Sequence, residues 1–100
     1  MPAKRALIMQ PNDNVATALE EIQAGDDVAA ALGKEGRAIR AAEAIPFGFK
    51  MALQDIPQGE FIRKYGEVIG RASTAIVRGT MVHVHNLEGT RARGDLERRA

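Results

Sequence analysis

The chain has two histidines, His83 and His85, and only Val84 separates them. In an extended strand successive side chains point to opposite faces, so both imidazoles would lie on one face. Residues at this spacing are about 6.5–7 Å apart along the backbone, and two imidazoles can converge on one metal ion across that gap. The spacing therefore allows both histidines to bind one metal ion. The alternative, two solvated histidines on an edge strand, stays open because two ligands alone do not hold a catalytic metal.

Other residues with useful chemistry do not complete a metal site by their spacing alone. Asn86 follows the histidines directly, and carboxylates are available at Asp13, Asp55 and Glu88. A metal site usually needs three or four protein ligands, and no spacing among these residues requires one. Two ligands from this chain would have to be completed from elsewhere.

Cationic side chains lie beside glycine turns, where side chains are presented to solvent or to a ligand. Lys64 precedes Tyr65 and Gly66, and Arg71 follows Gly70. These cations could bind an anion, or they could simply be solvated while the Tyr65 ring packs on the core.

The composition predicts one small soluble domain. The chain has 100 residues, of which 45% are hydrophobic and 27% charged, and its formal net charge is +1. So small a net charge argues against nucleic acid or an anionic membrane as a partner, although residues 91–100 form a basic tail after a domain at 1–90. There are no cysteines, which excludes disulfides and thiolate metal sites and agrees with a cytoplasmic location. The apolar run from Ala6 to Met9 is too short for a signal sequence or a membrane span.

A short unit occurs three times. Isoleucine, two residues, glycine, two residues and a β-branched aliphatic residue recur at 22–28, 56–62 and 76–82. Glycine can adopt positive φ, so each copy is interpreted as a tight turn that leads into a strand.

The pattern of the remaining residues predicts a mainly β fold with one short α-helix and short helical turns. Val15, Leu19 and Ile22 recur at helical spacing after a possible N-cap at Asn14, which predicts a helix over 14–22. Short helical connectors are expected at 50–55 and 70–75, and a hairpin tip at 33–36. The expected strands are Arg5 to Met9, Val28 to Leu32, Arg37 to Arg40, Phe61 to Lys64, Val68 to Arg71 and Thr80 to His85.

No complete catalytic motif is present. The chain has no Ser-His-Asp order, no phosphate-binding glycine loop and no zinc-finger spacing. One hundred residues also leave little room for a closed pocket beside a core. We therefore do not expect an enzyme that acts alone.

Several motifs in order resemble the SAF-type small subunit, or N-terminal domain, of the altronate and galactarate dehydratase family. They are Gln10 to Ala16, Met51 to Gly59, Ile62 to Gly66 with Ile69 to Ala72, and Gly79 to Leu87. The resemblance covers about residues 5–96 and implies a SAF-like β-clip fold. It also implies the small subunit of a metal-dependent hydro-lyase that dehydrates a sugar acid together with a large catalytic subunit, using a divalent metal, iron or manganese.

In such an enzyme the resemblance implies a role for each candidate residue. His83 and His85 would be catalytic and metal-binding, and the substrate-binding residues would be Lys50, Lys64, Arg71 and Asn86. One departure is that the family usually has Gly-His-Lys where this chain has Gly48, Phe49 and Lys50, so a third imidazole is absent.

Three alternatives remain from the sequence. Sulfolactate sulfo-lyase small subunits share the same organisation, and other SAF-like domains are stand-alone modules that bind carbohydrate or protein. The histidines could also only titrate in a structural domain. The isolated chain could form homo-oligomers.

Overall fold

The computed structural model describes residues 3–89, which form nine β-strands and no helix. The prediction of a mainly β fold is confirmed, whereas the basic tail predicted at 91–100 lies outside the described residues. None of the described residues belongs to a helix that could cross a membrane.

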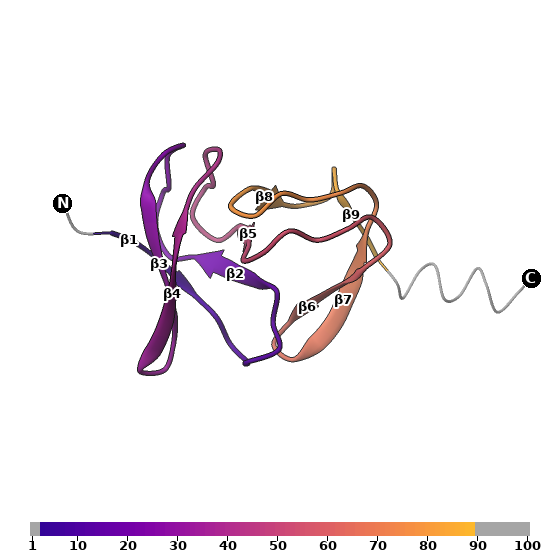
Figure 1. Cartoon of the computed structure of the whole chain (residues 1–100), viewed down its shortest axis with the longest axis horizontal. Helices are drawn as coiled ribbons and strands as arrows, with labels where there is room; N and C mark the ends of the chain where they lie inside the picture. The colour runs from indigo at the N-terminus through magenta and orange to yellow at the C-terminus, as the bar shows by residue number, and fades with distance from the viewer. Residues whose placement is uncertain (1–2, 90–100) are drawn as a thin grey trace, which may run out of the picture.

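The strands form two sheets. The larger has the order β4-β3-β1-β2-β5-β8 and the smaller the order β6-β7-β9. Figure 1 shows the β3–β4 hairpin at one side of the molecule and the β6–β7 hairpin at the other, with β2, β5 and β8 between them. The strands of the larger sheet are β1 (Lys4–Leu7), β2 (Val15–Ala18), β3 (Asp27–Leu32), β4 (Glu35–Arg40), β5 (Lys50–Ala52) and β8 (Met81–Val82), and those of the smaller are β6 (Phe61–Lys64), β7 (Glu67–Ala72) and β9 (Leu87–Glu88).

Two hydrophobic clusters form the core, and β2 contributes to both. Ala16 belongs to a first cluster under the larger sheet, whereas Val15 belongs to a second cluster that also takes residues from the smaller sheet. Successive side chains of a strand point to opposite faces, so a central strand can serve two clusters. The largest side chains of the first cluster are Ile8, Ile22, Ile39, Ile45, Met51 and Leu53, and those of the second are Ile56, Ile62, Ile76 and Val82.

The helix predicted over 14–22 is wrong, because residues 15–18 form strand β2 between β1 and β5. Val15, Ala16 and Ala18 are buried, whereas Leu19, which the helical pattern required in the core, is 37% exposed. β2 pairs with a strand on each of its two edges, and this pairing outweighs the helical spacing of Val15, Leu19 and Ile22. The predicted helical connectors at 50–55 and 70–75 are wrong for the same reason, since they hold β5 and the end of β7.

The glycine turns of the repeat are confirmed, and a fourth copy occurs at 45–48. The sequence pattern missed it because Met51 stands where the other copies have a β-branched residue. The copies pair through bridges between Ile22 and Ile45 and between Ile56 and Ile76. The glycines of the four turns have φ values of 88°, 88°, 90° and 87° at Gly25, Gly48, Gly59 and Gly79.

The predicted hairpin tip at 33–36 is confirmed between β3 and β4. Gly33 has φ 60°, whereas Lys34 is not among the residues with positive φ, which is the pattern of a two-residue type II′ turn. The pairing continues without a shift from Leu32 opposite Glu35 to Asp27 opposite Arg40.

Candidate functional site

The two histidines lie on a turn and not on a strand. The strand predicted over Thr80 to His85 ends at Val82, and the carbonyl oxygen of His83 accepts hydrogen bonds from the backbone N–H groups of Asn86 (3.0 Å) and Leu87 (2.9 Å). The alternation of a strand therefore does not apply to the pair. Turn residues two apart do not face each other as same-face strand residues do.

Asn86 closes this turn. Its side chain is 6% exposed; Oδ1 accepts a hydrogen bond from the His83 backbone N–H (2.9 Å), and Nδ2 donates to the Met81 carbonyl oxygen (2.9 Å). The amide is therefore committed to the backbone on both sides. Within this chain it positions the histidine turn.

The two imidazoles have different surroundings. The His83 ring packs at a tilt against the ring of Phe49, with 4.7 Å between the ring centroids, and is partly buried, whereas His85 is exposed. Phe49 therefore contacts His83 with an apolar ring.

Residues 3–89 do not fit a complete metal site. They contain no group of three or more His, Cys, Asp or Glu side chains that could hold an ion. The Asp13 carboxylate accepts four backbone N–H bonds, and Asp55 accepts one from Arg78. The metal-binding role of His83 and His85 therefore stays a prediction that needs further ligands from outside these residues.

Two lysines from different sheets act on each other through their charges. Lys50 begins β5 in the larger sheet and Lys64 ends β6 in the smaller. Burial lowers the pKa of Lys50 below its ordinary value of 10.5, and the nearby charge of Lys64 lowers the pKa further. Lys64 itself lies over the Tyr65 ring, 4.8 Å from its centroid. Neighbouring ammonium groups that repel each other form a favourable place for an anion.

The lysines and the histidine ring do not lie on the same side of the β5–β8 ribbon. Lys50 pairs with Val82, and directly opposed residues share a face, which here is the face of the second cluster. His83 instead contacts Phe49, which packs against the first cluster. The charge of Lys64 thus acts on Lys50, and His83 lies at the end of the same ribbon on its other face.

Arg71, the remaining predicted anion-binding residue, lies on β7 opposite Phe61. Its guanidinium group stacks over the Phe61 ring, 5.4 Å from the centroid, and its Nε is buried without a hydrogen-bond partner among residues 3–89. A buried N–H without a partner is unfavourable, so this group favours an acceptor. Lys64 and not Arg71 is the charge that acts on Lys50.

Replacing Lys50 by methionine is expected to raise the melting temperature of the isolated chain at pH 7. The folded state holds the lysine with a lowered pKa, so it binds fewer protons than the unfolded state, and stability increases as pH rises toward 10.5. Methionine removes the buried charge, and its advantage should shrink as pH approaches 10.5. Lys34→Met, at the exposed hairpin tip, is the control and should change little. A Lys50→Met chain that melts below the unaltered protein at pH 7 would contradict this account.

A family comparison decides the assignment. Residues 4–90 match the model of the altronate/galactarate dehydratase SAF domain. The chain belongs to this family. The match spans nearly all of the described strands, including the lysine pair and the histidine turn.

Curated relatives carry dehydratase and sulfo-lyase names. The chain is 40% identical over 83 residues to the altronate dehydratase of Bacillus subtilis (strain 168), covering 83% of this chain and 16% of that protein. It is 43% identical over 49 residues to the (2R)-sulfolactate sulfo-lyase subunit alpha of Chromohalobacter salexigens, covering 49% of this chain and 52% of that protein. With the galactarate dehydratase (L-threo-forming) of Escherichia coli (strain K12) it shares 55% identity over 40 residues, 40% of this chain and 8% of that protein. The chain therefore spans at most about half of each of these relatives.

Proposed function

We propose that this chain is the small subunit of a metal-dependent hydro-lyase that dehydrates a sugar acid of the altronate or galactarate type. A separate large subunit would supply most of the active site. The family match over residues 4–90 and the names of the relatives support the reaction class. The matched region is 16% of the altronate dehydratase, so the rest of the catalytic machinery would come from outside this SAF domain. We propose a cytoplasmic location, which the lack of cysteines favours.

The observation that carries this proposal is the family match over residues 4–90, and Lys50 and Lys64 are the cations that the structure offers to an acid group. A sugar acid has a carboxylate. If this carboxylate bound to Lys50 and Lys64, its negative charge would reduce the repulsion between the two ammonium groups. Dehydration requires removal of the proton beside that carboxylate, and cations at the carboxylate stabilise the negative charge that then develops. The role proposed for this chain is therefore to bind and orient the acid group. Arg71, with its unpartnered Nε, is proposed as a further anion contact.

The histidines and the metal form a second part of the proposal. A divalent metal, iron or manganese, would lie at the junction with the large subunit and assist the departing hydroxide. His83 and His85 would contribute to that junction from the turn that Asn86 closes, so a substrate that also reaches Lys50 would have to pass the end of the β5–β8 ribbon. Because residues 3–89 do not hold a complete site, most ligands would come from the large subunit.

Sulfolactate sulfo-lyase is the second candidate. One observation favours it: the relative of that name is called subunit alpha, and the match covers 52% of it, against 16% of the Bacillus subtilis altronate dehydratase and 8% of the galactarate dehydratase. Sulfolactate also carries a carboxylate, so the same lysines would bind it.

The test is to purify the chain together with its large subunit and to assay altronate, galactarate and sulfolactate in parallel. We expect dehydration of one of the two sugar acids. Release of sulfite from sulfolactate alone would establish the second candidate instead. A chain that forms no complex with a dehydratase-type subunit, and binds a carbohydrate or protein alone, would be a non-catalytic module.

The histidines are tested in the same assembled enzyme. His83→Ala and His85→Ala should each reduce turnover, and metal titration should show weaker binding of iron or manganese. Unchanged activity and unchanged metal binding in both variants would remove the histidines from the mechanism.

A further inference from the structure

We propose that the outer edge of β4 is a self-complementary surface through which two copies of this chain pair, with Gly36 of both copies at the two-fold axis. The copies would align antiparallel and join their six-stranded sheets into one continuous sheet. This inference does not depend on the reaction that the enzyme catalyses.

The backbone of β4 has unpaired groups on its outer edge. Leu32 and Glu35 flank a two-residue turn and form a hydrogen-bonded pair. In an antiparallel ladder, hydrogen-bonded and non-hydrogen-bonded pairs alternate. Gly36 and Ala38 therefore belong to non-hydrogen-bonded pairs with β3 and direct their N–H and C=O groups to the outer edge. The Ala38 carbonyl confirms this direction, because it accepts a hydrogen bond from Arg78 Nη2 (3.0 Å) on the outer side. β4 is the terminal strand of its sheet, and within residues 3–89 no strand pairs with this edge. Unpaired edges are a template for pairing with another chain.

The edge is open near Gly36 and closed farther along. Its pairing with β3 has no bulge, and it contains no proline. From Ala38 onward the edge is covered. Arg78 donates a hydrogen bond to the Ala38 carbonyl oxygen, and the Ala42 backbone N–H donates one to the carbonyl oxygen of Gly79. An added strand would therefore pair around Gly36, where the lack of a side chain allows close approach.

Charges on either side of Gly36 match those of a second copy. In an antiparallel pair centred on Gly36, Glu35 of each copy lies directly opposite Arg37 of the other, which gives two opposite-charge pairs. Within residues 3–89 neither side chain forms an ion pair in its own chain; the neighbouring Arg40 pairs with Asp27 instead. Such isologous complementarity, where the same patch meets itself, is the pattern of two-fold dimers.

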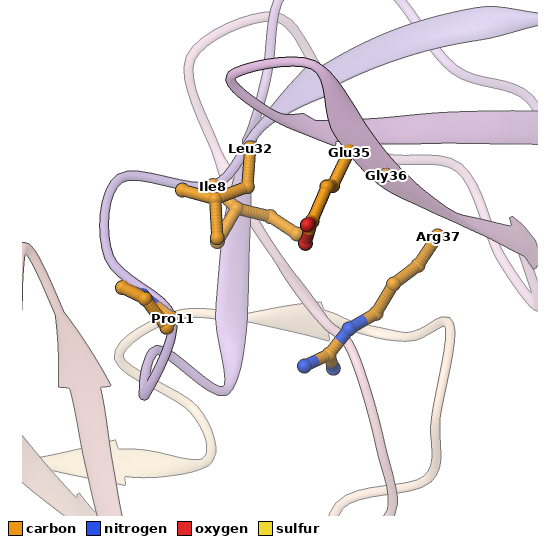
Figure 2. A pocket seen from close by; sticks show the side chains of 6 residues that line it. All are labelled: Ile8, Pro11, Leu32, Glu35, Gly36 and Arg37. Atoms are coloured by element: carbon orange, nitrogen blue, oxygen red, sulfur yellow. The ribbon is translucent and has the colours of Figure 1, made fainter.

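An open pocket beside Gly36 gives these side chains room. It has a volume of about 160 Å³ and is lined by Ile8, Pro11, Leu32, Glu35, Gly36 and Arg37. Figure 2 shows the side chains of Glu35 and Arg37 extending from β4 over this space, toward the loop that carries Pro11. The apolar floor can receive the aliphatic stem of an arginine while its charged end reaches a carboxylate. A second copy would thus cover a surface that residues 3–89 leave unfilled.

The test is sedimentation equilibrium of the full chain over a wide concentration range, combined with charge variants. We expect a monomer–dimer equilibrium, and Arg37→Glu should weaken it about tenfold or more because two attractive pairs become repulsive. Glu35→Arg should do the same, and the double variant Glu35→Arg/Arg37→Glu should restore dimerisation. Glu60→Arg, an equal change of charge at an exposed residue outside β4, is the matched control.

Hydrogen exchange gives an independent readout. The Gly36 amide should become protected as the concentration of the chain rises, in the unaltered protein and in the double variant but not in either single β4 variant. A chain that stays monomeric at about 1 mM, a range in which weak specific contacts are populated, would overturn the proposal. A dimer whose dissociation constant is the same in the charge variants as in the unaltered protein would also overturn it. So would a Gly36 amide whose hydrogen exchange slows only when the large subunit is added.

Discussion

Replacing Asp13 by alanine is expected to lower the free energy of unfolding by about 2–4 kcal/mol, because several backbone N–H groups lose a charged acceptor at once. The carboxylate is 3% exposed. Its Oδ2 accepts hydrogen bonds from the backbone N–H groups of Met9 (3.2 Å), Gln10 (3.0 Å) and Tyr65 (3.1 Å), and Oδ1 accepts one from Gly66 (2.7 Å). Asp13 therefore joins the loop after β1 to the turn between β6 and β7.

The size of this effect depends on burial and on the number of donors. An N–H group left buried without an acceptor loses its hydrogen bond to water as well. The same carboxylate also holds the turn where Tyr65 adopts φ 59°, a strained value for a residue with a side chain. Lys64 precedes this turn, so loss of Asp13 should also loosen one of the two cations of the candidate site.

Denaturant unfolding of matched variants measures the effect. Asp13→Asn keeps the shape but turns one acceptor into a donor, so it should also destabilise the chain. Asp55→Ala is the control, because Asp55 is exposed and accepts a single backbone bond, from Arg78. If Asp13→Ala and Asp55→Ala lowered the free energy of unfolding equally, the four hydrogen bonds to Asp13 would not stabilise the fold more than the single bond to Asp55.

Replacing Lys50 and Lys64 together by methionine is expected to raise the KM of the assembled enzyme for its acid substrate about tenfold or more, the effect of losing a hydrogen bond to a charged group. The same change should stabilise the isolated chain, because burial and mutual repulsion disfavour the charged form of Lys50. A substitution that raises stability but weakens substrate binding is typical of residues that are retained for function. Steady-state kinetics with Lys34→Met as the control would measure the difference. An unchanged KM in the double variant would remove the pair from substrate binding.

Local signals in the sequence were sufficient for the turns and for several strands. Gly33 marked the hairpin tip, and three repeated glycines marked turns because positive φ is a local requirement that glycine meets. The strand Phe61–Lys64 was predicted with its observed bounds, since β-branched and aromatic residues favour strands locally.

Features that depend on distant segments were not predictable. The segment at 15–18 satisfies a helical spacing, and only its neighbours β1 and β5 make it a strand. The end of β8 at Val82 depends on the Asn86 side chain, which closes the histidine turn three residues later. Asp13 was considered only as a possible ligand, because its four donors come partly from residues more than fifty positions away.

The candidate site was predictable in its members but not in its arrangement. Lys50 and Lys64 were named from the sequence as substrate-binding residues, yet their proximity follows from the packing of two sheets. The placement of His83 on the other face of the β5–β8 ribbon could not be inferred, because it depends on the contact with Phe49.

The most direct measurement of the central claim is the dehydration rate of the large subunit on altronate or galactarate as this chain is added to it. The account predicts a low rate for the large subunit alone and a saturable increase as the chain binds, with a weaker response to the Lys50→Met/Lys64→Met chain. A large subunit that reaches its full rate without this chain, or gains nothing from it, would contradict the account.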